Sequence, residues 1–366
     1  MEECKECKLG EIAHFTTGKL NSNAAEDNGL YPFFTCSPET YRINSYAFDT
    51  NAILLAGNNA EGNFNIKRYS GKFNAYQRTY VITVDDNTDL NFLFYALKLC
   101  LADFKHISQG TATKFLTAQI LNNFVIRLPP LPTQQKIAAI LSSLDDKIEL
   151  NNKINTNLEQ QAQALFDEMF KDYEKDILLG DVIETTSGGT PSRKNMAFYT
   201  NGNNCWVKSK ELESGFIIDT EEKITDHAIN NSAAKLLPKN SVLIAMYGAT
   251  VGAYGIISKP MTCNQAICAL LPNENYPYTY LFMFAKNVTQ ELENLAIGSA
   301  QQNISQVLIK KLKVHSDTNK IKEFHSSTHA LFEQMLLIRQ ENKTLSELRD
   351  SLLPKLMNGE IEVGIK

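Results

Sequence analysis

Two long stretches of this chain repeat the same seven-residue pattern of apolar side chains, about 187 positions apart. The first stretch runs through Ile137, Leu144, Asn151, Leu158 and Leu165, and the second through Phe324, Leu331, Ile338, Leu345 and Leu352. An interleaved set includes Ile148 and Asn155 in the first stretch and Asn342 in the second. Such spacing, kept over about five heptads, predicts a helix that buries one stripe against a partner helix. Two such helices in one chain can be each other's partner.

A globular stretch precedes each heptad stretch, so the chain is expected to be organised as two similar halves. The expected boundaries are a domain at 1–130, a spacer helix at 131–176, a second domain at 177–317 and a second spacer helix at 318–366. Short apolar runs predict strands at 52–56, 79–84 and 124–128 and again at 242–245, 253–257 and 266–271, and helices at 91–104 and 278–295. The fold class expected is α+β, with two globular mixed α/β domains separated by two long antiparallel coiled-coil helices in a pseudo-two-fold internal repeat.

Matching landmarks show where the two halves differ in length. Leu9–Ile12 recurs as Leu179–Val182 at an offset of 170, whereas Asn51–Leu54 recurs as Asn240–Leu243 at an offset of 189. The offset then stays nearly constant. The second half is therefore expected to carry an insertion early in its globular domain.

Two asparagines stand at equivalent heptad positions near the middle of the two helices. In an antiparallel pair related by a pseudo-two-fold axis, equivalent residues meet only at the centre. We therefore expect a contact between Asn155 and Asn342, which would fix the register at some cost in stability. The alternative is that both amides are solvated on a slightly rotated face.

The composition excludes several classes of protein. No run approaches the roughly 18 apolar residues of a membrane span, and Met1–Lys5 is too charged for a signal peptide, so a cytoplasmic chain is expected. The 7 cysteines are an odd number without disulfide spacing, which suits a reducing compartment. Cys4 and Cys7 form half of a zinc knuckle, but no second half follows, so free thiols and no metal are expected.

Charge is uneven along the chain, and this bears on nucleic-acid binding. The net charge is −5, which argues against binding to phosphates. However, residues 131–176 hold 5 basic and 9 acidic side chains, whereas residues 1–130 hold 12 and 13, and residues 177–317 hold 12 and 12. The acidic excess therefore lies on the first spacer helix. The globular domains are neutral, and local basic patches can still bind DNA.

Motifs of catalysis are missing from the sequence. There is no phosphate-binding G-x-x-x-x-G-K-[ST] loop, no H-E-x-x-H, no G-x-S-x-G elbow and no Asn/Asp-Pro-Pro-aromatic tetrapeptide. His325 and His329 are spaced i,i+4 on the second helix, but a metal would need a third ligand, so we interpret them as helix-surface or seam residues. These absences predict a chain that is not an enzyme.

The sequence resembles the specificity subunits of type I restriction-modification systems. The resemblance rests on the run LPPLPTQQKIAAILSSLDDKI that starts at Leu128, on SGGTPSR at Ser187–Arg193 and on SLLPKLMNGEI at Ser351–Ile361. Together with the repeat, these signatures extend over essentially the whole chain. The first half departs from the pattern, because Thr16-Thr17-Gly18-Lys19 stands where the second half has Gly-Gly-Thr-Pro.

The resemblance implies a non-catalytic DNA-recognition role. Similar proteins carry two target recognition domains, each of which reads one half of a split, asymmetric site in double-stranded DNA, held apart by two antiparallel helices. The helices dock two methylation subunits, which bind S-adenosylmethionine and methylate adenine, and two motor-nuclease restriction subunits can join them. No cofactor is implied for the chain itself. A separation of about one DNA turn, roughly 34 Å, suits two readers on a stiff support.

Polar and basic residues in loops without apolar periodicity are the candidates for contact with DNA. They are Lys19, Lys67, Arg68, Lys72 and Arg78 in the first domain and Thr190, Ser192, Arg193, Lys194, Lys208 and Lys210 in the second. Gln77 and Gln265 recur in both domains, so we interpret them as structural, because the two domains should read different sequences. Arg68 and Arg193 differ between the copies and are the better candidates for reading bases. Trp206 is interpreted as a core residue and not as a stacking platform.

Two other functions remain open from the sequence. The chain could be a scaffold or adaptor whose coiled coil binds partner proteins. It could also be the specificity part of a bifunctional restriction enzyme that cuts on both sides of its site. A basic concave surface on both globular domains would favour DNA recognition over a scaffold.

Overall fold

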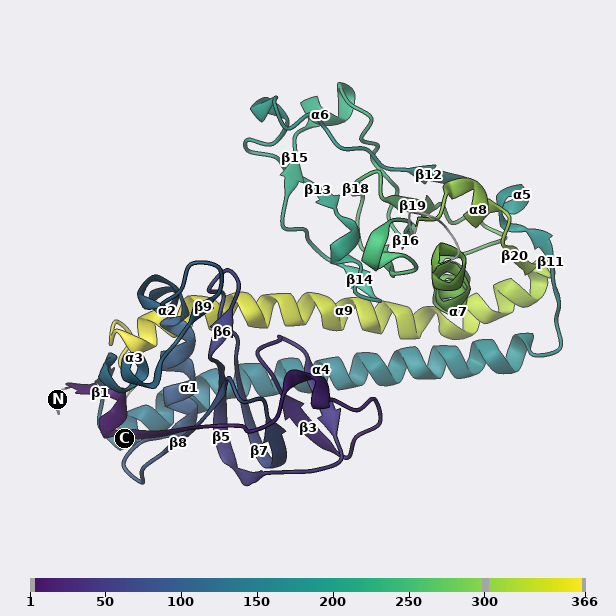
Figure 1. Cartoon of the computed structure of the whole chain (residues 1–366). Coiled ribbons are helices and arrows are strands. Elements are labelled where there is room, and N and C mark those ends of the chain that lie inside the picture. The colour runs from purple at the N-terminus through teal and green to yellow at the C-terminus, as the bar shows by residue number, and fades with distance from the viewer. Residues whose placement is uncertain (1–3, 298–302, 364–366) are drawn as a thin grey trace. The chain divides into compact units, whose positions relative to one another are not determined.

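The computed structural model describes residues 4–297 and 303–363 and divides into two compact units. The first unit contains Met1–Ile148 and Leu345–Lys366, and the second contains Glu149–Thr344. Two helices of 40 residues, α4 (Leu131–Phe170) and α9 (Thr318–Met357), contribute a stretch to each unit (Figure 1). At about 1.5 Å per residue, each helix is about 60 Å long.

The globular part of the first unit is built on a six-stranded sheet. In spatial order its strands are β2 (Ala13–Thr17), β8 (Thr79–Val84), β5 (Phe48–Ala56), β7 (Ile66–Ala75), β3 (Tyr31–Phe34) and β4 (Thr40–Ile43). Two short pairs accompany it, β1 (Lys5–Lys8) with β10 (Val125–Leu128) and β6 (Asn58–Asn59) with β9 (Lys114–Phe115). The central strand β5 contains the wholly apolar run Ala52–Ala56, which is buried on both faces as such a run predicts.

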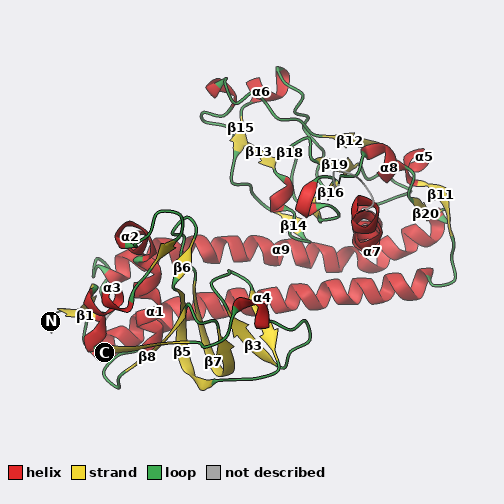
Figure 2. Ribbon diagram, in the orientation of Figure 1, coloured by secondary structure: helices red, strands yellow, loops and turns green. Residues whose placement is uncertain are grey.

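Three helices complete this domain: α1 (Leu90–Leu99), α2 (Leu101–Ile107) and α3 (Ala118–Asn123). Helix α1 begins where Asp89 accepts a hydrogen bond from the backbone N–H of Phe92 at 2.8 Å, an N-cap. Its residues Phe92–Leu97 are all buried, because α1 packs between the sheet and the long helices (Figure 2). The first domain is therefore seated on α4 through a continuous apolar core.

The second unit repeats this plan with a divided sheet. Five strands lie in the order β12 (Thr185–Ser187), β19 (Ile267–Leu270), β16 (Val242–Ala245), β17 (Tyr254–Ile257) and β14 (Phe216–Ile217). Three more lie in the order β15 (Lys223–Ile224), β13 (Asn204–Val207) and β18 (Thr262–Cys263), and β11 (Lys175–Leu178) pairs with β20 (Lys313–His315). The helices are α5 (Leu179–Val182), α6 (Asp226–Asn230), α7 (Tyr278–Ile297) and α8 (Gln306–Lys310). Helix α7 takes the place of α1 and packs between sheet and α9.

The internal repeat is visible in single backbone hydrogen bonds. The N–H of Gly57 donates to the carbonyl of Arg78 at 2.8 Å, and 188 to 189 positions later the N–H of Met246 donates to the carbonyl of Ala266, also at 2.8 Å. The parallel pairing of Phe33 with Asn74 likewise recurs as Trp206 with Thr262. The predicted repeat and the predicted strands and helices of the two globular domains are thus confirmed.

The expected insertion in the second domain is also present. Phe34 and Ile53 are 19 positions apart, whereas their structural equivalents Val207 and Val242 are 35 positions apart. The additional residues include β14 and α6, which have no counterpart in the first domain. The insertion therefore lengthens the loops of one domain without disturbing the shared framework.

The centre of the helix pair is polar, but its pairing differs from the prediction. Asn151 donates to Asn342 Oδ1 at 2.8 Å and to Glu341 Oε2 at 2.7 Å, and Asn342 donates to Asn152 Oδ1 at 2.9 Å. The expected contact between Asn155 and Asn342 is therefore wrong. The antiparallel register that joins 151 to 342 brings 155 level with Ile338, and the Oδ1 of Asn155 is buried without a partner among the described residues. The pseudo-two-fold axis relates the pair of Asn151 and Asn342 to the pair of Asn155 and Ile338, so only the first pair joins two asparagines.

The heptad stripe predicts most of the positions that α4 and α9 bury or partly bury, and it fails near the end of α4. Ile137, Phe324, Ile338 and Asn342 are buried, whereas Leu144, Ile148, Asn155, Leu158, Leu331, Leu345 and Leu352 are partly buried. Leu165 was expected in the seam, but its side chain is 38% exposed. A straight helix drifts by about 20° per heptad, so Phe166 has replaced it on the buried face, beside Ala162 of the interleaved set.

Two kinds of feature are absent from the described part of the chain. Within residues 4–297 and 303–363, no helix is long and apolar enough to cross a membrane. Over the same ranges, no group of three or more histidine, cysteine or acidic side chains is placed to hold a metal ion. His329 instead meets the hydroxyl of Tyr278 at 2.9 Å, and His325 meets that of Thr279 at 3.0 Å.

Candidate nucleic-acid interface

A tightly packed glycine pair lies near the start of residues 187–194 of the second domain, which we call the glycine loop. A Cβ atom on Gly188 would lie 2.0 Å from the carbonyl oxygen of Cys263, and one on Gly189 would lie 2.3 Å from the backbone carbon of Ala233. Only glycine fits at either position. The loop is also fixed by Trp206, whose indole N–H donates to the carbonyl of Gly189 at 3.0 Å. Trp206 is 2% exposed, which confirms that it is a core residue.

Arg193 is held above this core by aromatic rings and one carboxylate. Its guanidinium lies 4.5 Å from the ring centre of Tyr199 and 5.3 Å from that of Trp206, and Nη1 lies 2.5 Å from Glu222. The side chain remains 56% exposed. Arg193 and Lys208 together lower the pKa of Glu222 to about 2, so this carboxylate is ionised at neutral pH. The arginine is therefore presented at the surface in a defined position.

The two lysines that follow Trp206 join the same cluster of charges. Lys208 Nζ lies 2.8 Å from Glu222 and 3.1 Å from Glu221, and Lys210 Nζ lies 2.7 Å from Glu221. The hydrogen bond with Glu222 raises the pKa of Lys208, and the hydrogen bond from Lys210 lowers the pKa of Glu221. Sequence reasoning found the basic residues of this surface but not the glutamates that face them. The adjacent pair Glu221–Glu222 in a neutral domain was the available signal.

The remaining candidates of the second domain lie at the surface of the glycine loop. Ser192 and Lys194 are exposed, and within the described chain the side chain of Lys194 makes no hydrogen bond or ion pair. The hydroxyl of Thr190 donates to Gln265. In the first domain Gln77 donates to Asn21 Oδ1 at 2.9 Å. Both repeated glutamines therefore fasten a loop, as their structural interpretation requires.

The basic run of the first domain does not form a single cluster. Lys67 and Arg68 are neighbours on β7, so their side chains point to opposite faces of the sheet. Lys67 donates to the carbonyl of Glu39 at 2.6 Å and to the hydroxyl of Thr40 at 3.0 Å, and burial lowers the pKa of Lys67. Its ammonium group is thus already bound within the domain.

Arg68 is used as an anchor between the sheet and the long helix. Its Nη1 donates to Asn91 at 2.8 Å and to Ser142 at 2.7 Å, and Nη2 lies 3.3 Å from Asp146. The guanidinium also lies 5.7 Å from the ring centre of Tyr95. Reading of a base by Arg68 stays a prediction, and it would require release of these contacts.

The other basic candidates of the first domain are exposed. Lys72 lies 4.6 Å from the ring centre of Tyr46, and a hydrogen bond with Tyr46 raises the pKa of Lys72. A parallel bridge between Leu20 and Tyr76 brings the loop that carries Lys19 beside the turn that carries Arg78. Within the described chain, neither of these two side chains makes a hydrogen bond or ion pair. Lys19 and Arg78 are therefore cations of the first domain that DNA could contact without breaking an internal bond, and they lie where the second domain has the glycine loop.

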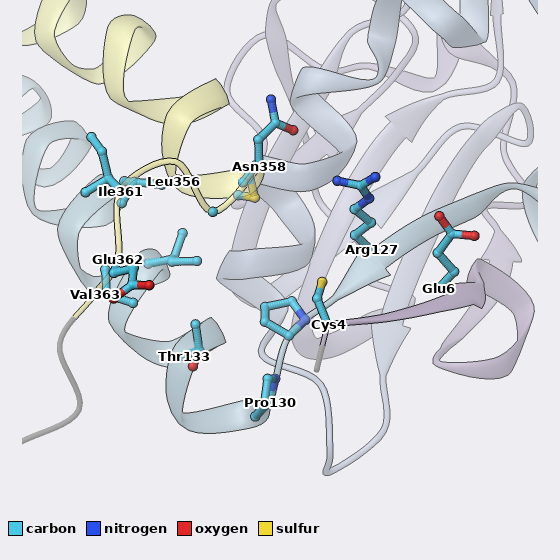
Figure 3. A pocket seen from close by; sticks show the side chains of 14 residues that line it. Cys4, Glu6, Arg127, Pro130, Thr133, Leu356, Asn358, Ile361, Glu362 and Val363 are labelled. Atoms are coloured by element: carbon cyan, nitrogen blue, oxygen red, sulfur yellow. The ribbon is translucent and has the colours of Figure 1, made fainter. Parts of the chain in front are cut away.

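A separate hollow of about 710 Å³ lies in the first unit, away from these candidates. Figure 3 shows side chains from the start of α4, from β10 and from the segment after α9 around it. Arg127, Glu6 and Glu362 are its charged residues, and Ile137 and Leu356 supply part of its apolar surface. None of the residues predicted to contact DNA lines it.

Comparison with known proteins identifies the family. The model of the type I restriction modification DNA specificity domain matches residues 1–160 and 171–316. The chain belongs to this family. The resemblance inferred from the central-helix, glycine-loop and C-terminal signatures is thus confirmed.

Individual relatives agree with the family assignment. The specificity subunit of the type I restriction enzyme EcoDI from Escherichia coli is 41% identical over 162 residues, which are 44% of this chain but only 35% of that protein. The HindI specificity subunit from Haemophilus influenzae is 27% identical over 342 residues, covering 70% of this chain and 74% of that protein. A crystal structure of a type I S subunit from M. genitalium has the same fold, with a TM-score of 0.59 at 17% identity over 97% of this chain and 96% of that one. As a specificity subunit, the chain is a DNA-recognition protein and not a catalyst.

Proposed function

We propose that this chain recognises a split, asymmetric site in double-stranded DNA, in the cytoplasm, with one globular domain for each half of the site. The observation that supports the proposal is that the two globular domains share one backbone framework but differ in their loops. The backbone hydrogen bond from Gly57 recurs as that from Met246, whereas Thr16-Thr17-Gly18-Lys19 in the first domain corresponds in sequence to a Gly-Gly-Thr-Pro-Ser-Arg-Lys loop in the second. A shared framework gives two readers of the same kind, and unlike loops give them different specificities.

The insertion in the second domain strengthens the proposed difference between the readers. It adds residues between Val207 and Val242, and it begins with Lys208 and Lys210. Phosphate contacts position a protein on DNA, while base contacts specify the sequence. Two domains with different base-contacting loops would read two different half-sites, as an asymmetric target requires.

The long helices suit the second part of the proposal, which is assembly. A pair of 40-residue helices is a stiff support that can hold two readers at a fixed separation. A pseudo-two-fold chain also offers two equivalent faces to two copies of one partner. We propose that these partners are two methylation subunits that carry S-adenosylmethionine and methylate adenine, and that two motor-nuclease subunits join to form a restriction complex.

Sequencing of the methylome in a host with and without this gene tests the proposal. The expected result is one split motif that is methylated only when the gene is present. A double variant, Arg193→Gln with Lys194→Gln, should alter the half of the motif read by the second domain and leave the other half unchanged. Lys171→Gln, which removes one charge near the end of α4, is the control and should preserve the whole motif. The proposal would be contradicted if deletion of the gene left every methylated motif in place, or if the double variant changed both halves of the motif.

A further inference from the structure

The cations around the glycine loop of the second domain are matched by carboxylates. Arg193, Lys208 and Lys210 each lie within 3.1 Å of an oxygen of Glu221 or Glu222. Of the four basic candidates in the second domain, Lys194 is the one without such a partner in the described chain. The surface therefore carries positive side chains while being nearly neutral.

The two glutamates are held in place by the surrounding backbone. Glu211 accepts hydrogen bonds from the N–H groups of Lys208 and Glu221, both at 2.8 Å. The hydroxyl of Thr220 donates to the carbonyl of Glu222 at 2.6 Å. Glu221 and Glu222 therefore project from a backbone that is fixed by hydrogen bonds, and the ion pairs with Arg193, Lys208 and Lys210 hold their carboxylates.

This arrangement changes what the cations can gain from DNA. Exposed ion pairs contribute only about 0–1 kcal/mol, so they can be exchanged for another anion. Affinity for an arbitrary duplex comes mainly from neutralisation of phosphates with release of counterions. The carboxylate that the cation leaves nevertheless stays beside it and repels the incoming phosphate, so the net gain from the phosphate is reduced. Non-specific binding by this surface is thereby weakened.

The geometry of Arg193 leaves room for a different kind of ligand. Glu222 accepts a hydrogen bond from Nη1 of Arg193, and the guanidinium carbon lies 4.5 Å and 5.3 Å from the ring centres of Tyr199 and Trp206. The planar fork of arginine has five N–H donors, and it pairs with the O6 and N7 of guanine through two of them. A guanine edge therefore offers Arg193 two parallel hydrogen bonds, whereas the hydrogen bond to Glu222 comes from Nη1.

We propose that Glu222, assisted by Glu221, is a specificity-determining residue that occupies the cations of the glycine loop and so favours a guanine edge over the phosphates of an arbitrary duplex. This inference rests on the proposed DNA recognition and deepens it. Glu222 suppresses binding to the wrong DNA, and Arg193 supplies binding to the right base.

Binding of the full chain to a random-sequence 40-base-pair duplex, followed by fluorescence anisotropy at several NaCl concentrations, tests this proposal. Glu222→Gln keeps the shape of the side chain and removes its charge. It should bind the duplex more tightly than the wild type does, and this gain should be roughly threefold larger at about 50 mM than at about 200 mM salt. The slope of log K against log salt should steepen by about 1, which is the effect of one added phosphate contact. In a background of Arg193→Gln, the same change should give a smaller gain.

Glu168→Gln is the matched control. It removes the same charge and frees one cation, since Glu168 on α4 lies 2.8 Å from Lys171, which follows the helix. Equal gains for Glu222→Gln and Glu168→Gln, no gain for Glu222→Gln, or weaker binding by Glu222→Gln would each overturn the proposal. Failure of the wider proposed function would instead appear as an unchanged methylome on deletion of the gene, which the duplex measurement does not involve.

Discussion

Asn151 and Asn155 lie one helical turn apart on α4, and the structure predicts opposite effects when each is replaced by leucine. Asn151 donates two hydrogen bonds, to Asn342 and Glu341, at 2.8 and 2.7 Å. Asn155 has a buried Oδ1 with no partner among the described residues. The same substitution therefore removes satisfied contacts at one position and an unsatisfied group at the other.

The magnitudes follow from the cost of burying an unpaired polar atom, which is about 1–3 kcal/mol. Asn151→Leu leaves the buried Oδ1 of Asn342 without its donor, so the free energy of unfolding should fall by about 2–3 kcal/mol. Asn155→Leu removes the unpaired oxygen, and the helix register places the new side chain level with Ile338. We expect a gain of only about 1 kcal/mol, because Asn155 also lines a cavity of about 330 Å³ with polar neighbours such as Arg339.

Hydrogen exchange of the full chain, read in peptides that cover residues 148–158 and 335–345, measures these effects where they arise. Protection should rise about fivefold for Asn155→Leu and fall by a factor of about 30 or more for Asn151→Leu. The melting temperature should move in the same directions, by about 2–4 °C for each kcal/mol in a domain of this size. Shifts of the same sign for both variants would refute the register of the helix pair and the reasoning about Asn155.

Two further predictions concern anchoring of the first domain and the pH dependence of the second. Arg68→Gln should destabilise the chain by about 2 kcal/mol in thermal unfolding, because Arg68 bonds to Asn91 and Ser142, whereas Lys72→Gln should change stability by less than about 0.5 kcal/mol; equal effects would contradict the anchoring role. Burial lowers the pKa of His315 to about 4 from an ordinary value of 6.5, so between these pH values the unfolded chain binds a proton that the folded chain does not. Stability from this group is complete above about pH 6.5 and falls by up to about 3 kcal/mol as the pH drops towards 4, and denaturant unfolding of His315→Gln should lack this part of the pH dependence.

Much of the fold could be predicted from local patterns in the sequence. The heptad spacing from Ile137 and from Phe324 indicated two long helices because helix periodicity depends only on neighbours along the chain. The run Ala52–Ala56 indicated a central strand for the same reason. The offsets between repeated landmarks located the insertion, since a shared framework keeps its spacing wherever both copies are built alike.

Tertiary structure decided which partner each polar side chain has. Asn342 meets Asn151 and not Asn155 because the register of two helices depends on packing along their whole length. Leu165 is exposed because small differences between the heptad and the helix turn accumulate. Heptad positions in the sequence therefore predict neither the register of the helix pair nor the drift of the buried stripe.

The candidate interface divides in the same way. Composition and spacing identified Arg193, Lys208 and Arg68 as basic residues in suitable segments. They could not show that Glu222 neutralises the first two, or that Arg68 faces Ser142 on α4, because these partners are 14 to 74 positions away in the chain. Charge is a property of a residue, whereas the field at a surface depends on which residues the fold brings together. The sequence thus determined the two-domain, two-helix plan, and the folded structure determined which cations are available to DNA.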